Sequence, residues 1–195
     1  MDYRFIFFFT LFVIGCGNTT APVTWQKADN QSYPLDDESR RLSGGTCPVV
    51  QLTEYEGDYL PYHRPLKVNP FFRERLQQFE LVVAEVSIRE LGETPSAIKH
   101  FGAYNCRKIK GRNKMSEHGL GNAIDVSGFA FTDFSISIEK DWHAGDERSD
   151  FLHALAKELS TRPDIFRGML GPGAKGHDDH FHFDVGKHRY LRMNY

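Results

Sequence analysis

One segment near the carboxyl end, residues 176–184, constrains the fold of this chain more than any other. Its sequence is Gly-His-Asp-Asp-His-Phe-His-Phe-Asp. Successive side chains of an extended strand point to opposite faces. A strand here would place polar side chains on one face, at His180, His182 and Asp184. It would place apolar side chains on the other, at Phe181, Phe183 and Val185. The apolar face is typical of a strand over a core, so the polar face is expected to line a site.

A second segment, Ser116–Asp125, is expected to lie against the first. Its sequence is Ser-Glu-His-Gly-Leu-Gly-Asn-Ala-Ile-Asp. Gly119 and Gly121 allow a tight backbone course that a Cβ would hinder. The alternation that follows them predicts a strand with Asp125 on its polar side. A histidine in a glycine-rich loop, or a His-x-His pair, indicates little alone; the prediction depends on the coincidence of both segments.

Three residues from these segments match a catalytic zinc site: His118, Asp125 and His182. Catalytic zinc takes three protein ligands and keeps one position for water, with nitrogen and oxygen donors about 2 Å away. An aspartate as the third ligand, and a set without thiolate, argue against a closed structural site. The plain alternatives are a surface histidine at position 118 and a strand aspartate at position 125 that pairs with a lysine.

Polar residues next to His182 are the candidates for catalysis. Asp179 lies three residues before it and could accept a proton from the attacking water. His180 shares the polar face of the strand and could donate to an oxyanion, and His177 could share either role. On an ideal strand Asp179 faces away from the histidines. It therefore reaches a metal only if the chain bends before the strand.

The amino-terminal residues predict export. An apolar run from Phe5 to Gly15 is too short to span a bilayer as a helix and suits the apolar part of a secretory signal. The run ends in a sequence that resembles a bacterial lipobox, Val13-Ile-Gly-Cys16. That resemblance implies cleavage before Cys16 and attachment of lipid to it, with residues 1–15 as the signal peptide. The alternative is an ordinary signal peptide with an unrelated cysteine.

Residues 16–44 are predicted to form a flexible tether, because they are rich in polar residues and show no sustained periodicity. The remaining residues, 45–195, have the usual size of one compact domain. The formal net charge is −2. With no basic stripe, this charge argues against nucleic acid as a partner.

Two cysteines remain if Cys16 carries lipid. Cys47 and Cys106 form an even pair in a compartment that permits disulfides. We expect them to be bridged, with Cα atoms within about 7 Å of each other. Two buried free thiols are the alternative.

Periodicity predicts two helices. Asn69 is a suitable N-cap, Pro70 suits the first helical position, and apolar residues recur at threes and fours up to about Leu91. Ser149 is predicted to cap a second helix. Strands are predicted over residues 102–107, 122–127 and 129–139 and in the final segment.

The combined motifs resemble those of known families. The metal-binding signature of a group of zinc peptidases is similar to Ser116-x-His-x-x-Gly-x-Ala-x-Asp125 followed by His180-x-His182. That group includes D-alanyl-D-alanine carboxypeptidases, lysostaphin-like enzymes and the hedgehog signalling domain. Over about residues 45–186 the chain more closely resembles the bacterial extensin-like carboxy-terminal domain family. This closer resemblance rests on Cys47-Pro-Val, Gly102–Arg107, Ser116–Asp125 and Gly171-Pro-Gly through His182.

The peptidase resemblance implies roles for individual residues. It implies the same three zinc ligands as above. In several members the acid three residues before the last ligand acts as base and is usually glutamate; here it is the shorter Asp179. Some endopeptidases instead carry a histidine five residues before that ligand, as His177 does. In some members an upstream arginine helps to bind or polarise substrate, which makes Arg107 a candidate.

The resemblance also implies a fold and an activity. The fold would be a small single α+β domain, with helices packed on a central antiparallel sheet that carries the zinc site. The activity would be zinc-dependent hydrolysis of the peptide stems or cross-links of bacterial peptidoglycan, by a carboxypeptidase or an endopeptidase. We expect a monomeric lipoprotein, anchored in the outer membrane and facing the periplasm. Two alternatives stay open: a non-catalytic wall-binding module that retains the metal, and a metal-buffering lipoprotein.

Overall fold

The computed structural model describes Cys47 and residues 51–195. The predicted signal peptide, the predicted lipidation site Cys16 and the predicted tether lie outside these residues. No helix in the described part of the chain is long and apolar enough to cross a membrane. In chain order the elements are β1 (Thr53–Tyr55), β2 (Leu66–Val68), α1 (Pro70–Leu91), β3 (Ala97–Gly102), the 3₁₀ helix η1 (Glu117–Leu120), β4 (Ala123–Ala130), β5 (Ser135–Ser137), α2 (Ile138–Asp141), α3 (Glu147–Ser160), β6 (Gly168–Leu170), β7 (Phe181–Asp184) and β8 (Tyr190–Arg192).

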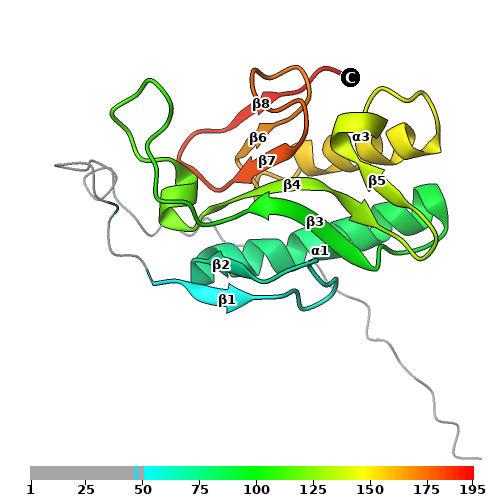
Figure 1. Cartoon of the computed structure of the whole chain (residues 1–195), viewed down its shortest axis with the longest axis horizontal. Coiled ribbons are helices and arrows are strands. Elements are labelled where there is room, and N and C mark those ends of the chain that lie inside the picture. The colour runs from blue at the N-terminus through cyan, green and yellow to red at the C-terminus, as the bar shows by residue number, and fades with distance from the viewer. Residues whose placement is uncertain (1–46, 48–50) are drawn as a thin grey trace, which may run out of the picture.

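A mixed sheet of six strands forms the centre of the domain (Figure 1). Strand β4 pairs antiparallel with β3 on one side and with β5 and β7 on the other. Beyond β7 lies β6, which is antiparallel to β7, and then β8, which is parallel to β6. The α+β class is confirmed. The central strands pair antiparallel as expected, and the edge strand β8 is the one that runs parallel to its neighbour.

Helix α1 covers one face of this sheet, with α3 packed against it (Figure 1). The ring of Phe79 on α1 lies 5.6 Å from that of Phe183 on β7, measured between ring centroids. Phe181 and Phe183 are fully buried. The predicted apolar face of the last segment is thus confirmed as core, and its other face is turned away from α1.

The ends of α1 follow the predicted signals. The side chain of Asn69 accepts a hydrogen bond from the backbone N–H of Phe71, and Pro70 is the first helical residue. Gly92 ends the helix with φ +79°, a left-handed conformation that glycine adopts without steric cost. These caps fix the helix at the predicted bounds.

One buried acid in α1 has a role that its sequence position did not reveal. Glu80 is fully buried and accepts hydrogen bonds from the hydroxyl of Tyr55, at 2.5 Å, and from the backbone N–H of Tyr59, at 2.8 Å. A buried carboxylate needs such donors, because leaving one unpaired is costly. Glu80 therefore fixes the connection between β1 and β2 against the helix.

Two predicted strands differ in extent from those observed. Strand β3 ends at Gly102, so the strand expected over residues 102–107 is wrong. The backbone there binds His118 instead of a neighbouring strand: the carbonyl of Ala103 contacts its ring, and the N–H of Asn105 donates to its carbonyl. The strand expected over 129–139 gives way to α2 at Ile138, where the Asp141 carboxylate accepts from the backbone N–H of Ser137.

The start of α3 also differs by three residues. Asp146, not Ser149, is the N-cap. The Asp146 carboxylate accepts from the N–H of Ser149, and the hydroxyl of Ser149 accepts from the N–H of Asp146. This reciprocal capping box satisfies donors on both sides of the first turn. Ser149 does belong to the cap of α3, but as the N3 residue of the capping box and not as the N-cap.

The predicted disulfide is present. Cys47 and Cys106 are bridged, with their Cα atoms 5.7 Å apart and a sequence separation of 59. Closing a loop of that size stabilises a domain by roughly 3 to 4.5 kcal/mol in the chain-entropy model. The bridge ties the first described residue to the segment that leads from β3 to η1.

Candidate metal site

Three side chains from three separate elements converge beside the centre of the sheet. His118 belongs to η1, Asp125 to β4 and His182 to β7. Asp125 and His182 are directly paired across the two strands, so their side chains share a face. His118 Nε2 lies 3.1 Å from Asp125 Oδ1 and 3.1 Å from His182 Nδ1, and the latter two atoms are 2.9 Å apart. The convergence expected from the two sequence segments is therefore observed.

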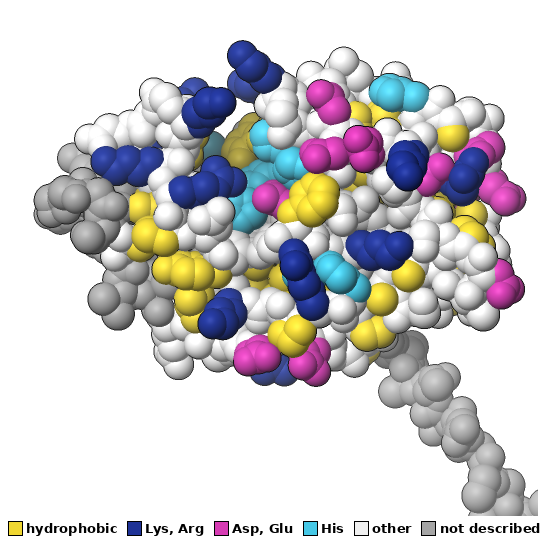
Figure 2. All heavy atoms as spheres, viewed as in Figure 1, with side chains coloured by type: hydrophobic (Ala, Val, Ile, Leu, Met, Phe, Trp, Pro, Cys, Tyr) yellow, Lys and Arg dark blue, Asp and Glu magenta, His cyan; other side chains and the backbone are white. Residues whose placement is uncertain are grey.

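This donor set fits zinc. Donors about 2 Å from one tetrahedral centre lie about 3.3 Å from one another, close to the separations observed. The set combines two imidazole nitrogens with one carboxylate oxygen. Among the described residues, these three form the one group of three or more His, Cys, Asp or Glu side chains whose ligand atoms come together in this way. Figure 2 shows histidines gathered in a hollow of the surface, with acidic and hydrophobic side chains at its rim.

His118 is held in one orientation by its own segment. Ser116 caps η1, and Gly121 ends it with φ +68°. A Cβ at Gly121 would also come within 2.9 Å of the backbone nitrogen of Asn69, so this turn needs glycine. The ring Nδ1 of His118 lies 2.6 Å from the carbonyl oxygen of Ala103. Since a carbonyl only accepts, Nδ1 carries a proton, and Nε2 is the atom that faces the other two converging residues.

His182 is oriented by a carboxylate that the sequence analysis had not assigned. Its Nε2 lies 3.0 Å from Oδ2 of Asp184, so Nδ1 is the atom that faces Asp125 and His118. Asp184 also accepts from the N–H of Gly186, at 2.7 Å, and from the hydroxyl of Tyr190. A carboxylate that accepts the outer N–H of a ligand histidine fixes the ring and raises its basicity as a ligand.

The alternation along β7 placed Asp184 on the face of His182 without giving it a role, but Tyr190 could not have been found from the sequence. Asp184 lies two residues after His182, on the same face of the strand. Tyr190 reaches it only because β8 runs parallel to β6, which pairs Tyr190 with Gly168. A Cβ on Gly168 would overlap the Asp184 carboxylate and the Tyr190 ring. Glycine at 168 therefore leaves the space in which this contact forms.

This arrangement predicts a loss of metal affinity when the outer contacts are removed. Asp184→Asn should weaken zinc binding by about 10- to 100-fold, and Tyr190→Phe by less, because outer contacts of ligand histidines typically contribute that much. Competition with a chromophoric chelator would measure both. Tyr195→Phe is a matched control, since Tyr195 is 60% exposed. Unchanged affinity in both variants would contradict the role assigned to Asp184.

The charges within the group are strongly coupled. Burial alone would raise the pKa of Asp125, but its hydrogen bonds and charge interactions with His118 and His182 outweigh that effect and hold its pKa well below the ordinary range. Burial would likewise lower the pKa of His182, but its hydrogen bonds to Asp125 and Asp184 raise it to about 9. Without metal, His182 is therefore protonated at neutral pH and Asp125 is ionised.

Metal binding should consequently release a proton. A ligand histidine must be neutral, so zinc displaces the proton of His182 at any pH below about 9. Below neutral pH we expect zinc affinity to rise by about tenfold per pH unit, because His182 must lose its proton while a zinc-bound water with a pKa of about 7 stays mostly un-ionised. Calorimetry at about pH 6 in buffers of different ionisation enthalpy should show about one proton released. A binding enthalpy independent of the buffer would contradict the assignment.

The catalytic candidates Asp179 and His180 form a pair. His180 Nδ1 lies 2.6 Å from Asp179 Oδ1, and His180 Nε2 lies 3.6 Å from Asp125 Oδ1. The side chain of Asp179 is half exposed. Asp179 therefore contacts His180 rather than the three converging residues, and a turn precedes β7.

His177 lies beside both His180 and His182. Its ring centroid is 4.9 Å from that of His180 and 5.8 Å from that of His182. Its Nδ1 lies 3.2 Å from the carbonyl oxygen of Lys175, which leaves Nε2 as the free atom. Burial and the neighbouring histidines lower its pKa. His177 is thus a neutral imidazole beside the site.

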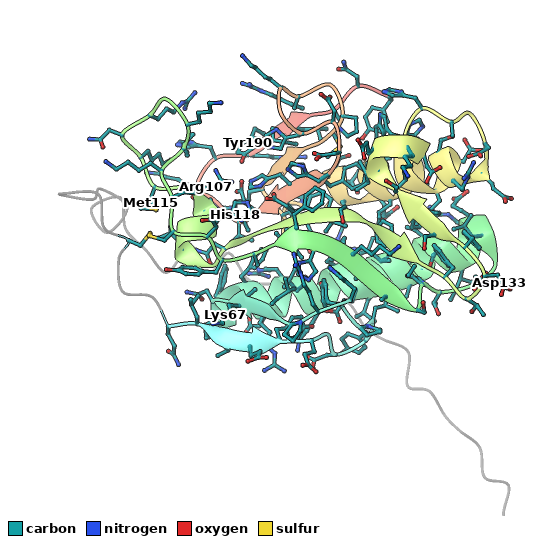
Figure 3. All side chains as sticks on the ribbon, in the orientation of Figure 1. Lys67, Arg107, Met115, His118, Asp133 and Tyr190 are labelled. Carbon is teal, nitrogen blue, oxygen red and sulfur yellow. A yellow bond between two sulfur atoms is a disulfide. The ribbon has the colours of Figure 1, made fainter. Side chains whose placement is uncertain are left out.

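Arg107 is less closely placed. Figure 3 shows Arg107 and Met115 in the loop that precedes His118. The backbone carbonyl of Arg107 accepts from the N–H of Ser116, but its side chain is exposed and forms no ion pair among the described residues. The structure therefore brings Arg107 to the neighbourhood of His118 through its backbone alone.

Comparison with known proteins gives a family and no activity. The family described as "Extensin-like protein C-terminus" matches residues 24–194, a range that begins within the predicted tether and covers every residue of the candidate site. No curated protein and no solved structure matches the chain. The match spans nearly the whole sequence, and so the chain belongs to the extensin-like protein C-terminus family.

Proposed function

We propose that this protein is a zinc-dependent peptidase that acts on the peptide stems or cross-links of bacterial peptidoglycan. The observation that carries the proposal is the convergence of His118, Asp125 and His182, whose donor atoms lie 2.9 to 3.1 Å apart. Two imidazoles and one carboxylate are a ligand set typical of catalytic rather than structural zinc. The peptidoglycan substrate follows from the resemblance of the motifs and from the predicted export of the chain.

The residues present could hold a zinc ion and could also carry out the proton transfers that hydrolysis of a peptide bond needs. Bound zinc would polarise the scissile carbonyl and lower the pKa of a water molecule to about 7. The side chains of His118, Asp125 and His182 would hold the ion. Asp184 would keep His182 in the tautomer that presents Nδ1.

His180 is suited to stabilise a developing oxyanion. Its Nδ1 is paired with Asp179, so its Nε2 is oriented toward Asp125 and the centre of the group. In its protonated form His180 would donate from Nε2 to negative charge that forms at the substrate carbonyl oxygen.

Two residues compete for the role of proton acceptor. Asp179 was expected from the sequence, but one of its oxygens is engaged by His180 and its side chain is half exposed. His177 has a free Nε2 and a lowered pKa, and its ring lies beside both His180 and His182. The geometry favours His177 as the acceptor of the water proton, which it would pass to the leaving amine. Asp179 would then serve to position His180.

The alternatives from other functional classes explain less of the site. A wall-binding module that retains a structural metal would not need His177 and His180 around an incomplete ligand set. A metal-buffering lipoprotein would not need the Asp179–His180 pair. The proposal also includes lipid attachment at Cys16, an outer-membrane location facing the periplasm and a monomeric state. These parts concern residues or partners outside the described structure.

The proposal is tested by digesting purified peptidoglycan fragments. Zinc-loaded protein should cleave peptide bonds, and protein treated with chelator should not, as read by mass spectrometry of the products. The masses of the fragments would also distinguish loss of a terminal residue from cleavage of a cross-link. Binding of zinc without cleavage of any fragment would favour the non-catalytic alternative.

A further inference from the structure

An exposed aromatic side chain stands at the edge of the candidate site because of an irregularity in β3. His100 pairs with Val126 and Gly102 pairs with Asp125, so Phe101 is an extra residue between consecutive pairs. Such bulges often redirect a side chain next to an active site. Gly102 has φ +150°, a conformation that residues with a Cβ rarely adopt. Glycine at this position therefore permits the bulge.

The bulge is fixed from outside the sheet. The Arg64 Nη2 group donates to the carbonyl oxygen of Phe101, at 2.8 Å, and to that of His100, at 3.2 Å. These bonds satisfy carbonyl groups that the irregular pairing leaves turned outward. Because the backbone of Phe101 is held, a ligand that meets the ring does not have to order this part of the chain.

The ring borders the residues assigned to chemistry. The centroids of Phe101 and His180 are 5.6 Å apart, with the two planes at 71°. The Nε2 atom of this same His180 lies 3.6 Å from Asp125 Oδ1. Phe101 is nevertheless 54% exposed, whereas most large apolar side chains of the domain are buried. An apolar surface thus lies open to water within one side chain of the converging ligands.

We propose that Phe101 forms an apolar subsite that packs against a C–H-rich group of the substrate next to the cleaved bond. Peptidoglycan offers two groups of this chemistry, the methyl of an alanine residue and the C–H face of an amino sugar. Covering the exposed ring would remove apolar area from water on both partners. The inference rests on the proposed function and deepens it, since it assigns part of the substrate preference to one residue.

The test compares two exposed aromatic residues in the full-length chain. Phe101→Ala is matched with Tyr59→Ala, because Tyr59 is 57% exposed. Phe101→Leu keeps an apolar side chain. Binding of purified disaccharide-peptide fragments to metal-free protein is measured by calorimetry, and kcat and KM are measured on zinc-loaded protein. Parallel arms use the same peptide without sugar and a peptide with glycine in place of alanine beside the scissile bond.

We expect Phe101→Ala to raise Kd and KM by about tenfold with kcat nearly unchanged, as expected for lost contact with an apolar group. Phe101→Leu should recover part of the loss, and Tyr59→Ala should bind as the unaltered protein does. If the group is an alanine methyl, replacing alanine with glycine should weaken binding to the unaltered protein by the same factor and should not weaken binding to the Phe101→Ala variant further. If the group is the sugar, removing the disaccharide should have this pattern of effects instead.

Three results would overturn the inference, and they are distinguishable. Equal binding by the Phe101→Ala variant and the unaltered protein, with cleavage intact, would remove the subsite and leave the peptidase proposal standing. Neither binding nor cleavage of any fragment by zinc-loaded, unaltered protein would remove both. A fall in kcat with unchanged Kd would also reject the subsite, because it would mean that Phe101 acts on His180 rather than on substrate.

Discussion

Replacing His118 with Ala is expected to abolish stoichiometric zinc binding and to reduce peptide hydrolysis to the level of chelated protein. The substitution removes one of three ligands, so the loss of affinity should exceed the roughly 100-fold expected from losing an outer contact. Zinc content after dialysis, measured by atomic emission, and turnover of peptidoglycan fragments would test both expectations.

His188→Ala is the matched control for this variant. His188 is exposed and lies outside the converging group. It should keep full zinc content and activity. Circular dichroism would establish that the His118→Ala variant stays folded, since His118 also binds the carbonyl of Ala103. Retained zinc in folded His118→Ala protein would show that the metal, if any, is held elsewhere.

Replacing His177 with Ala is expected to lower kcat by at least about 100-fold while zinc affinity stays within a few-fold of the original. General-base catalysis contributes about 10² to 10⁴ in rate, and His177 contacts the ligand group without belonging to it. Initial rates with zinc-loaded protein and chelator competition would give the two quantities.

Asp179→Asn separates the two candidate bases. If Asp179 positions His180, the amide keeps one oxygen that can accept from His180 Nδ1, and the variant should keep more activity than His177→Ala. If Asp179 is itself the base, the amide cannot accept the proton, and turnover should fall by about 100-fold or more with zinc retained. Near-normal turnover of His177→Ala, together with such a fall in Asp179→Asn, would reverse the assignment.

The elements that local sequence determines were predicted well. The cap at Asn69, Pro70 and the stop at Gly92 fix α1, because helix ends depend on the few residues that satisfy orphan backbone groups. Alternation correctly predicted the two faces of β7 and the face on which Asp125 lies, because successive side chains of a strand point to opposite faces. Two errors were local, at the N-cap of α3 and at the start of α2. The strand expected over residues 102–107 failed for another reason, because that segment binds the distant His118.

The sequence by itself determined the three ligand candidates and the cysteine pair. The residue types of His118, Asp125 and His182 already identify them as metal-binding candidates. The short segments around them set the direction of each side chain. What only the tertiary structure decided is how the surrounding residues divide their roles. Tyr190 reaches Asp184 through the parallel pairing of β8, and Asp179 turns to His180 rather than to the ligands. Such contacts depend on strand order and bulges, which arise from packing distant segments together and leave no periodic trace in the chain.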